Sequence, residues 1–116
     1  MFKVIALLAK KPDIIWAANE GATVGAVTAV KNAKKGKKVK VFGTDVSKQI
    51  IKMLQANDGI LKAVTGQKPK VMGNEAMEVA IRAAKGKPIH DKKLIPAELF
   101  KREEKAKLAA YLKTLD

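Results

Sequence analysis

The 116-residue chain contains no cysteine, a single histidine and few aromatic residues. The lack of cysteine excludes disulfides, thiolate zinc sites and a cysteine nucleophile. The one histidine, His90, cannot form a histidine metal cluster or a histidine pair, so we expect no metal site and no cofactor. No apolar run approaches the ~20 residues of a membrane-spanning helix, so no membrane span is predicted.

Arginine is also scarce, which bears on how the strong positive charge is interpreted. Lys and Arg total 24 against 11 Asp and Glu, a net charge of +13, but only Arg82 and Arg102 are arginine. Base recognition favours the planar arginine fork, and aromatics at 4% are too few for a stacking platform. The densest lysine run, residues 34–40 around Gly36, is typical of a solvated turn. Specific nucleic-acid recognition is therefore not expected, and non-specific polyanion binding stays an alternative.

Apolar runs alternate with helical patterns along the chain, and this predicts an α/β fold with a mostly parallel sheet. Glycine or short polar groups separate most of these segments, and Ser47 is placed to begin one of the helices. The expected strands are Asp13–Ala18, Lys38–Gly43, Ile60–Thr65 and a short segment in Leu94–Lys101; the expected helices are Lys3–Leu8, Ala22–Ala33, about Ser47–Asn57, Lys70–Lys85 and Glu103–Leu115.

One polar residue follows each of the first three predicted strands. These residues are Asn19, Asp45 and Gln67. Because parallel strands end at the same edge of a sheet, we expect the three side chains to share one rim. Their amide and carboxylate groups both donate and accept hydrogen bonds, which suits sugar hydroxyls. Each also has a plainer interpretation: Asn19 and Asp45 as helix-capping residues, and Gln67 as loop surface.

Several other residues are expected to serve packing rather than chemistry. Trp16 lies in an apolar run and is predicted to be in the core, in a strand buried on both faces. The helix at residues 70–85 is predicted to turn Met72 and Val79 inward, with Ala76, Ala80 and Ala83. His90 is expected to be exposed in a loop. No dinucleotide or phosphate-binding loop occurs, and Asp45 has no titratable partner in sequence, so we expect no enzyme activity.

Four segments, in order, resemble a known family. Residues 11–20, KPDIIWAANE, look like the strand that ends in an Asn-Asp pair in type 1 periplasmic sugar-binding proteins, the ribose/galactose-binding group of ABC importers. Residues 41–45, VFGTD, resemble the family's Val-x-Gly-x-Asp strand end, and residues 62–69, KAVTGQKP, resemble its third strand and Gln-x-Pro crossing. Residues 72–86 look like the helix that comes next. The resemblance spans residues 1–102.

The resemblance implies a fold, a site and a set of partners. It implies an incomplete three-layer α/β/α lobe, with Asn19, Asp45 and Gln67 binding a monosaccharide, a pentose or a hexose, through its hydroxyls. It further implies an ABC permease as partner of the full-length protein and a periplasmic or extracytoplasmic location. Two positions depart from the family: Glu20 replaces the usual Asp, and Val46 the usual Gly.

Length is the largest departure, because family members are two to three times as long. Residues 1–68 match the second-lobe half, and residues 69–116 match a crossing helix, a short strand and a C-terminal helix. The exposed edges and uncovered face expected of a partial sheet predict a homo-oligomer or a separate N-terminal lobe. A second alternative is the effector-binding part of a sugar-responsive transcription regulator, which shares this fold.

Overall fold

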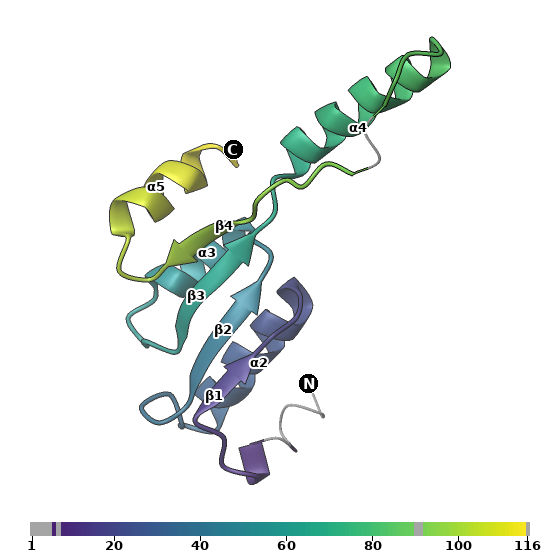
Figure 1. Ribbon diagram of the computed structural model, residues 1–116. Helices are drawn as coiled ribbons and strands as arrows, with labels where there is room; N and C mark the ends of the chain where they lie inside the picture. Colours follow the sequence, from purple (N-terminus) through teal and green to yellow (C-terminus); the bar gives the residue numbers. More distant parts are fainter. Residues whose placement is uncertain (1–5, 7, 90–91, 116) are drawn as a thin grey trace. The chain divides into compact units, whose positions relative to one another are not determined.

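The computed structural model describes residues 6, 8–89 and 92–115. It divides the chain into two units, one comprising residues 1–66 with 99–116 and the other residues 67–98. Strands and helices alternate, as predicted (Figure 1). In chain order they are β1 (Ile14–Trp16), α2 (Glu20–Asn32), β2 (Lys40–Thr44), α3 (Lys48–Gln55), β3 (Leu61–Gly66), α4 (Pro69–Ala84), β4 (Glu98–Lys101) and α5 (Lys105–Lys113).

The strands form one sheet in the order β1-β2-β3-β4. β1 pairs with β2 and β2 with β3, both in parallel, whereas Figure 1 shows β4 running in the opposite direction. The helices α2 and α3 provide the crossover connections that parallel neighbours require. The predicted α/β fold with a mostly parallel sheet is therefore confirmed, and β1, β2 and β3 all end at the same edge.

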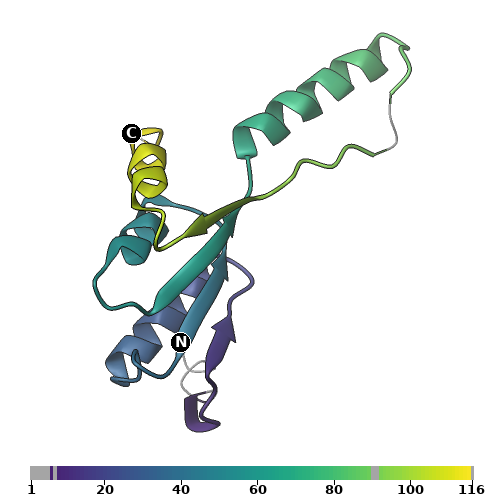
Figure 2. The same cartoon turned by 60° about the vertical axis from the view of Figure 1, so that its left-hand side comes forward.

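A layer of helices covers one face of this sheet. Figures 1 and 2 place α2 and α3 on the same side, and α5 packs against α3. The core lies between these helices and the strands, where apolar residues at helical spacing meet the inward residues of the strands. Its most deeply buried side chains are Val30, Val41, Ile50, Ile51, Leu54, Ile60, Leu61, Val64, Phe100 and Leu108.

Helix α2 approaches β2 closely at Gly43. A Cβ atom at this position would lie 2.4 Å from Oγ1 and 2.6 Å from Cγ2 of Thr23, which is fully buried. On the same side of α2, Ala26 and Ala29 are buried, as the predicted small-residue face requires. The hydroxyl of Thr23 donates to the backbone oxygen of Asn19 at 2.8 Å. Glycine at position 43 therefore sets the distance between the first turn of α2 and the sheet.

Arg102 holds the C-terminal part of the first unit to the rest of that unit. Its Nε donates to the Leu61 oxygen at 2.6 Å and its Nη2 to the Met53 oxygen at 3.0 Å. Its Nη1 donates to the Ala56 oxygen, and Nη2 also lies 3.3 Å from Oδ1 of Asp58. Since carbonyls at a helix C-terminus lack helical partners, this half-buried guanidinium both caps α3 and pins β3 to the segment after β4.

The predicted burial of the first strand is wrong. β1 is an edge strand, and the exposed fractions of Ile14 and Trp16 are 63% and 69%. Only Ile15 of this strand packs against the core. Trp16 is therefore not a core residue, because in the part of the chain that the structure describes helices cover only the opposite face of the sheet. Of the predicted fourth strand, only Glu98–Lys101 is extended into the sheet.

The predicted inward face of the fourth helix is also wrong. No residue of α4 is buried, and Met72 is 42% exposed. The second unit, as far as it is described, holds no sheet against which α4 could pack. Within this unit Arg82 Nη2 donates to the Pro88 oxygen at 2.9 Å, and Lys93 pairs with Glu75.

Two predictions fall wholly or partly outside the described residues. His90 is one of them. The helix predicted at the start of the chain is the other: Ala6, Leu8 and Ala9 are helical, and the remainder of it is not described.

Replacing Gly43 with alanine tests the close approach of α2 to β2. The added methyl must displace buried Thr23, so we expect Gly43→Ala to lower the free energy of unfolding by about 1–3 kcal/mol. Gly25→Ala is the matched control, because nothing lies within 4 Å of a Cβ there, and it should be neutral or stabilising by about 0.5–1 kcal/mol. Urea unfolding measures both, and equal midpoints for the two variants would contradict the tight contact.

Replacing Arg102 with lysine tests the clamp. A single ammonium cannot reproduce the fork of guanidinium donors, so Arg102→Lys should cost about 2–3 kcal/mol of unfolding free energy through unpaired carbonyls. Arg82→Lys is the control, since Arg82 is exposed and makes one such bond. Thermal unfolding compares them, and an equally small effect at both positions would show that the clamp contributes nothing.

Candidate functional site

The edge where β1 and β2 end is also where α2 and α3 begin, and it brings polar groups together. Asn19 precedes α2 and Asp45 follows β2 directly. Both belong to the first unit. Phe42 and Trp16 are register partners in the paired strands, so the residues just beyond them lie on adjacent strands at one edge. We call this edge, with Asn19, Glu20, Asp45 and Ser47, the strand-end rim.

Asn19 is the N-cap of α2. Its backbone is extended, with φ −157° and ψ 174°, and its Oδ1 accepts a hydrogen bond from the Ala22 nitrogen at 2.9 Å. The capping interpretation of Asn19 is therefore confirmed. The cap occupies one oxygen lone pair, while the amide nitrogen carries two donors and the residue is exposed. Capping thus orients the side chain without using its donors.

Asp45 has an uncommon backbone conformation. Its φ is 72°, in the left-handed region, which costs a non-glycine residue about 1 kcal/mol or more. The Asp45 nitrogen donates to the Thr65 oxygen at 2.8 Å, so the pairing of β2 with β3 continues one residue past β2. The half-buried carboxyl group is thereby held on a fixed backbone at the strand-end rim. Strain of this kind concentrates at binding sites.

Two helix starts at the rim are tied together by a bond that the sequence analysis did not predict. Ser47 Oγ donates to Glu20 Oε1 at 2.5 Å, across 27 residues of sequence. Ser47 is also the predicted N-cap of α3, with Oγ 3.3 Å from the Ile50 nitrogen. Glu20 in the first turn of α2 suits the positive end of the helix dipole. The acidic first turn was the available signal, but its partner could not be read from the sequence.

A buried hydroxyl lies beside this pair. The side-chain oxygen of Thr44, the last residue of β2, is buried and has no hydrogen-bond partner among the described residues. Buried polar groups are nearly always paired in native proteins. Thr44 directly precedes Asp45, so the sheet side of the rim offers a further donor and acceptor.

Gln67, the third predicted site residue, follows β3 directly in the chain. It is exposed and is the first residue of the second unit, residues 67–98. That unit is described by itself, so the expected convergence of Gln67 with Asn19 and Asp45 stays a prediction. Of the three, the structure brings Asn19 and Asp45 to the same edge.

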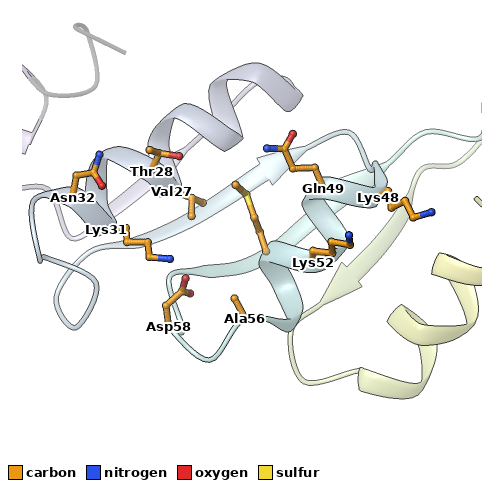
Figure 3. A pocket seen from close by; sticks show the side chains of 10 residues that line it. Val27, Thr28, Lys31, Asn32, Lys48, Gln49, Lys52, Ala56 and Asp58 are labelled. Atoms are coloured by element: carbon orange, nitrogen blue, oxygen red, sulfur yellow. The ribbon is translucent and has the colours of Figure 1, made fainter.

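Lysines gather away from the rim, in two places. One is a hollow of about 710 Å³ between α2 and α3, lined by Lys31, Lys48 and Lys52 with Asp58 opposite (Figure 3). The other is a hollow of about 490 Å³ where the strands begin, lined by Lys11, Lys34, Lys35, Lys37 and Lys38. Neither includes Asn19, Asp45 or Gln67. The predicted lysine turn is largely exposed, as expected of a solvated surface.

The described residues also bear on two classes of function. They contain no group of three or more His, Cys, Asp or Glu side chains placed to hold a metal ion. No helix among them has the length and apolar character needed to span a bilayer.

Comparison with known proteins identifies relatives of one kind. A family model described as periplasmic binding protein domain matches residues 3–88. The ABC transporter periplasmic-binding protein YphF of Escherichia coli (strain K12) is 34% identical over 107 residues, which cover 87% of this chain and 32% of that protein.

Solved structures of similar fold include two sugar-related proteins. A periplasmic solute-binding protein of an ABC transporter from Actinobacillus succinogenes 130z, with bound D-allose, is 27% identical, with a TM-score of 0.80 over 91% of this chain and 37% of its own. The glucose-galactose binding protein GanP from Geobacillus stearothermophilus is 20% identical, with a TM-score of 0.81 over 89% of this chain and 37% of its own, and shows the same fold. The chain thus spans about a third of the length of these relatives.

The conformation of Asp45 can be tested by two substitutions at that position. Both Asp45→Gly and Asp45→Ala remove the carboxylate, but only glycine relieves the left-handed strain, so the glycine variant should be the more stable by about 1 kcal/mol. At exposed Asp13 the order should reverse, with alanine at least as stable as glycine. Chemical denaturation provides the comparison, and an alanine variant at position 45 as stable as the glycine variant would refute the strain.

Proposed function

The chain belongs to the periplasmic binding protein domain family, and on that premise we propose that it forms a sugar-binding part of an ABC importer's solute-binding protein. The observation that carries the proposal is the strand-end rim, where Asn19 and strained Asp45 follow adjacent parallel strands. In α/β sheets of this kind, ligands bind beyond the carboxyl ends of the strands. The family is one of binding proteins, in line with the expected lack of enzyme activity.

Each rim residue has a proposed role set by its hydrogen-bonding capacity. The Asp45 carboxylate accepts two sugar hydroxyl protons in charge-assisted bonds. The Asn19 amide nitrogen donates to a hydroxyl oxygen, since its Oδ1 already caps α2. Gln67 contributes a further amide after β3. Sugar hydroxyls donate and accept at the same time, so a mixture of these groups matches them better than a rim of one kind.

The Glu20–Ser47 bond supports this proposal through positioning. It links the first turn of α2 to the N-cap of α3, and Asn19 and Asp45 lie one and two residues away from its two ends. A ligand bound between Asn19 and Asp45 requires these two segments to keep their spacing. A rigid connection at that point reduces the entropy lost when a ligand binds.

The partners and location follow from the same premise. We propose a monosaccharide ligand, an ABC permease as the partner of the full-length protein, and an extracytoplasmic location. The relatives named above are transport proteins, which favours the importer over the transcription regulator. Because the chain spans about a third of their length, a sugar on the rim stays open to water, and we expect its affinity to be weak.

An NMR titration with D-allose, D-galactose, D-ribose and L-arabinose tests the proposal. We expect at least one sugar to shift the amide signals of residues 18–22 and 44–48, while residues 34–38 in the lysine turn stay unchanged. Asp45→Asn should weaken that binding roughly tenfold or more, because a hydrogen bond to a charged group contributes about 1.5–3 kcal/mol.

Asp13→Asn is the matched control for charge. It removes a carboxylate from the opposite end of β1, where the side chain is exposed, and should leave the titration unchanged. No shift at the rim with any of the four sugars at high millimolar concentration, or equal effects of the two substitutions, would refute sugar binding at Asn19 and Asp45.

A further inference from the structure

One face of the sheet is apolar and uncovered in the described part of the chain. The helices α2, α3 and α5 all lie against the other face (Figures 1 and 2). The exposed fractions of Ile14, Trp16 and Leu99 are 63%, 69% and 45%. The residues of this open face that line its central hollow are Ile14, Lys40, Phe42, Lys62, Ala63, Leu99, Lys101 and Glu103.

Parallel sheets are normally covered on both faces, because their crossover helices lie on the two sides. Here both crossover helices lie on one side, so the open face leaves a tryptophan, an isoleucine and a leucine in water. Its hollow has a volume of about 620 Å³, enough for several side chains of a packed helix. The same sheet already accepts α2 and α3 on its opposite face, so its curvature suits a helix.

The charges around the hollow select the occupant. Three lysines surround the apolar centre against one acidic residue, Glu103. The ammonium of Lys40 donates to the Gly36 oxygen at 2.6 Å, which leaves Lys62 and Lys101 as the charges that set the preference. We propose that the open face binds an amphipathic helix of another polypeptide, with an apolar stripe and acidic residues beside it.

The same charges argue against a second copy of this chain as the occupant. Face-to-face pairing would bring Lys62 and Lys101 of one copy against those of the other. Each copy also carries a net charge of +13, and like charges brought together in a desolvated interface oppose association. An acidic partner gains from both terms, and it buries the apolar side chains that a dimer would also have to bury.

Trp16 provides a direct reading of occupancy, because it is the chain's single tryptophan and lies on the open face. Covering it moves its fluorescence emission to shorter wavelength. The probes are two synthetic helical peptides with the same leucine stripe at i, i+3, i+4 and i+7, one flanked by glutamates and the other by lysines. We expect the glutamate peptide to shift the emission and the lysine peptide to bind at least roughly tenfold more weakly.

Two sets of variants assign the binding to this face. Leu99→Asp should weaken the glutamate peptide roughly tenfold or more, while Leu115→Asp, at 40% exposure beyond α5, should not. The pair Lys62→Glu and Lys101→Glu, made together, should reverse the preference between the two peptides. Circular dichroism checks that each variant is folded before the titration.

Several results would overturn the proposal. These are equal binding of both peptides, binding of neither, and a preference for the lysine peptide by the unaltered chain. A fourth is concentration-dependent dimerisation in the ultracentrifuge that shifts Trp16 emission and is lost in Leu99→Asp, which would make a second copy the occupant. None of these results bears on sugar binding at the strand-end rim, which the NMR titration tests separately.

Discussion

The close contact between Thr23 and Gly43 sets the geometry on which the candidate site depends. Thr23 is fully buried against a glycine that has no room for a side chain, and its hydroxyl holds the backbone oxygen of Asn19. Asp45 follows Gly43 by two residues. One packing contact therefore fixes the height of the α2 N-terminus over the sheet, and with it the spacing of the two rim residues that the proposed ligand would touch.

The first unit satisfies its polar groups through a few connections but leaves one surface uncovered. Arg102 binds carbonyls at the end of α3 and the start of β3, and Glu20 binds Ser47 at the rim. These bonds keep the helix layer and the strands in one arrangement. They do nothing for the opposite face, where Trp16 is exposed. The rim and the open face thus belong to one sheet but depend on different contacts.

Local patterns predicted much of the fold and part of the site. The alternation of apolar runs and helical segments predicted the parallel sheet, and Ser47 was identified as a cap because capping involves neighbours in sequence. The Glu20–Ser47 bond and the Arg102 clamp were missed because each joins residues far apart in the chain. Trp16 was wrongly placed in the core, since an apolar run reads the same whether one or both faces of its strand are covered.

Local order was thus decided by the sequence alone: which segments become strands and helices, that the strands run mostly in parallel, and that Asn19, Asp45 and Gln67 each follow a strand. These features depend on interactions within a few residues or on the handedness of the crossovers. Tertiary structure alone decided which face of the sheet is covered, which backbone is strained at Asp45, and which distant partners Glu20 and Arg102 find. Those depend on contacts across the fold, which no local pattern encodes.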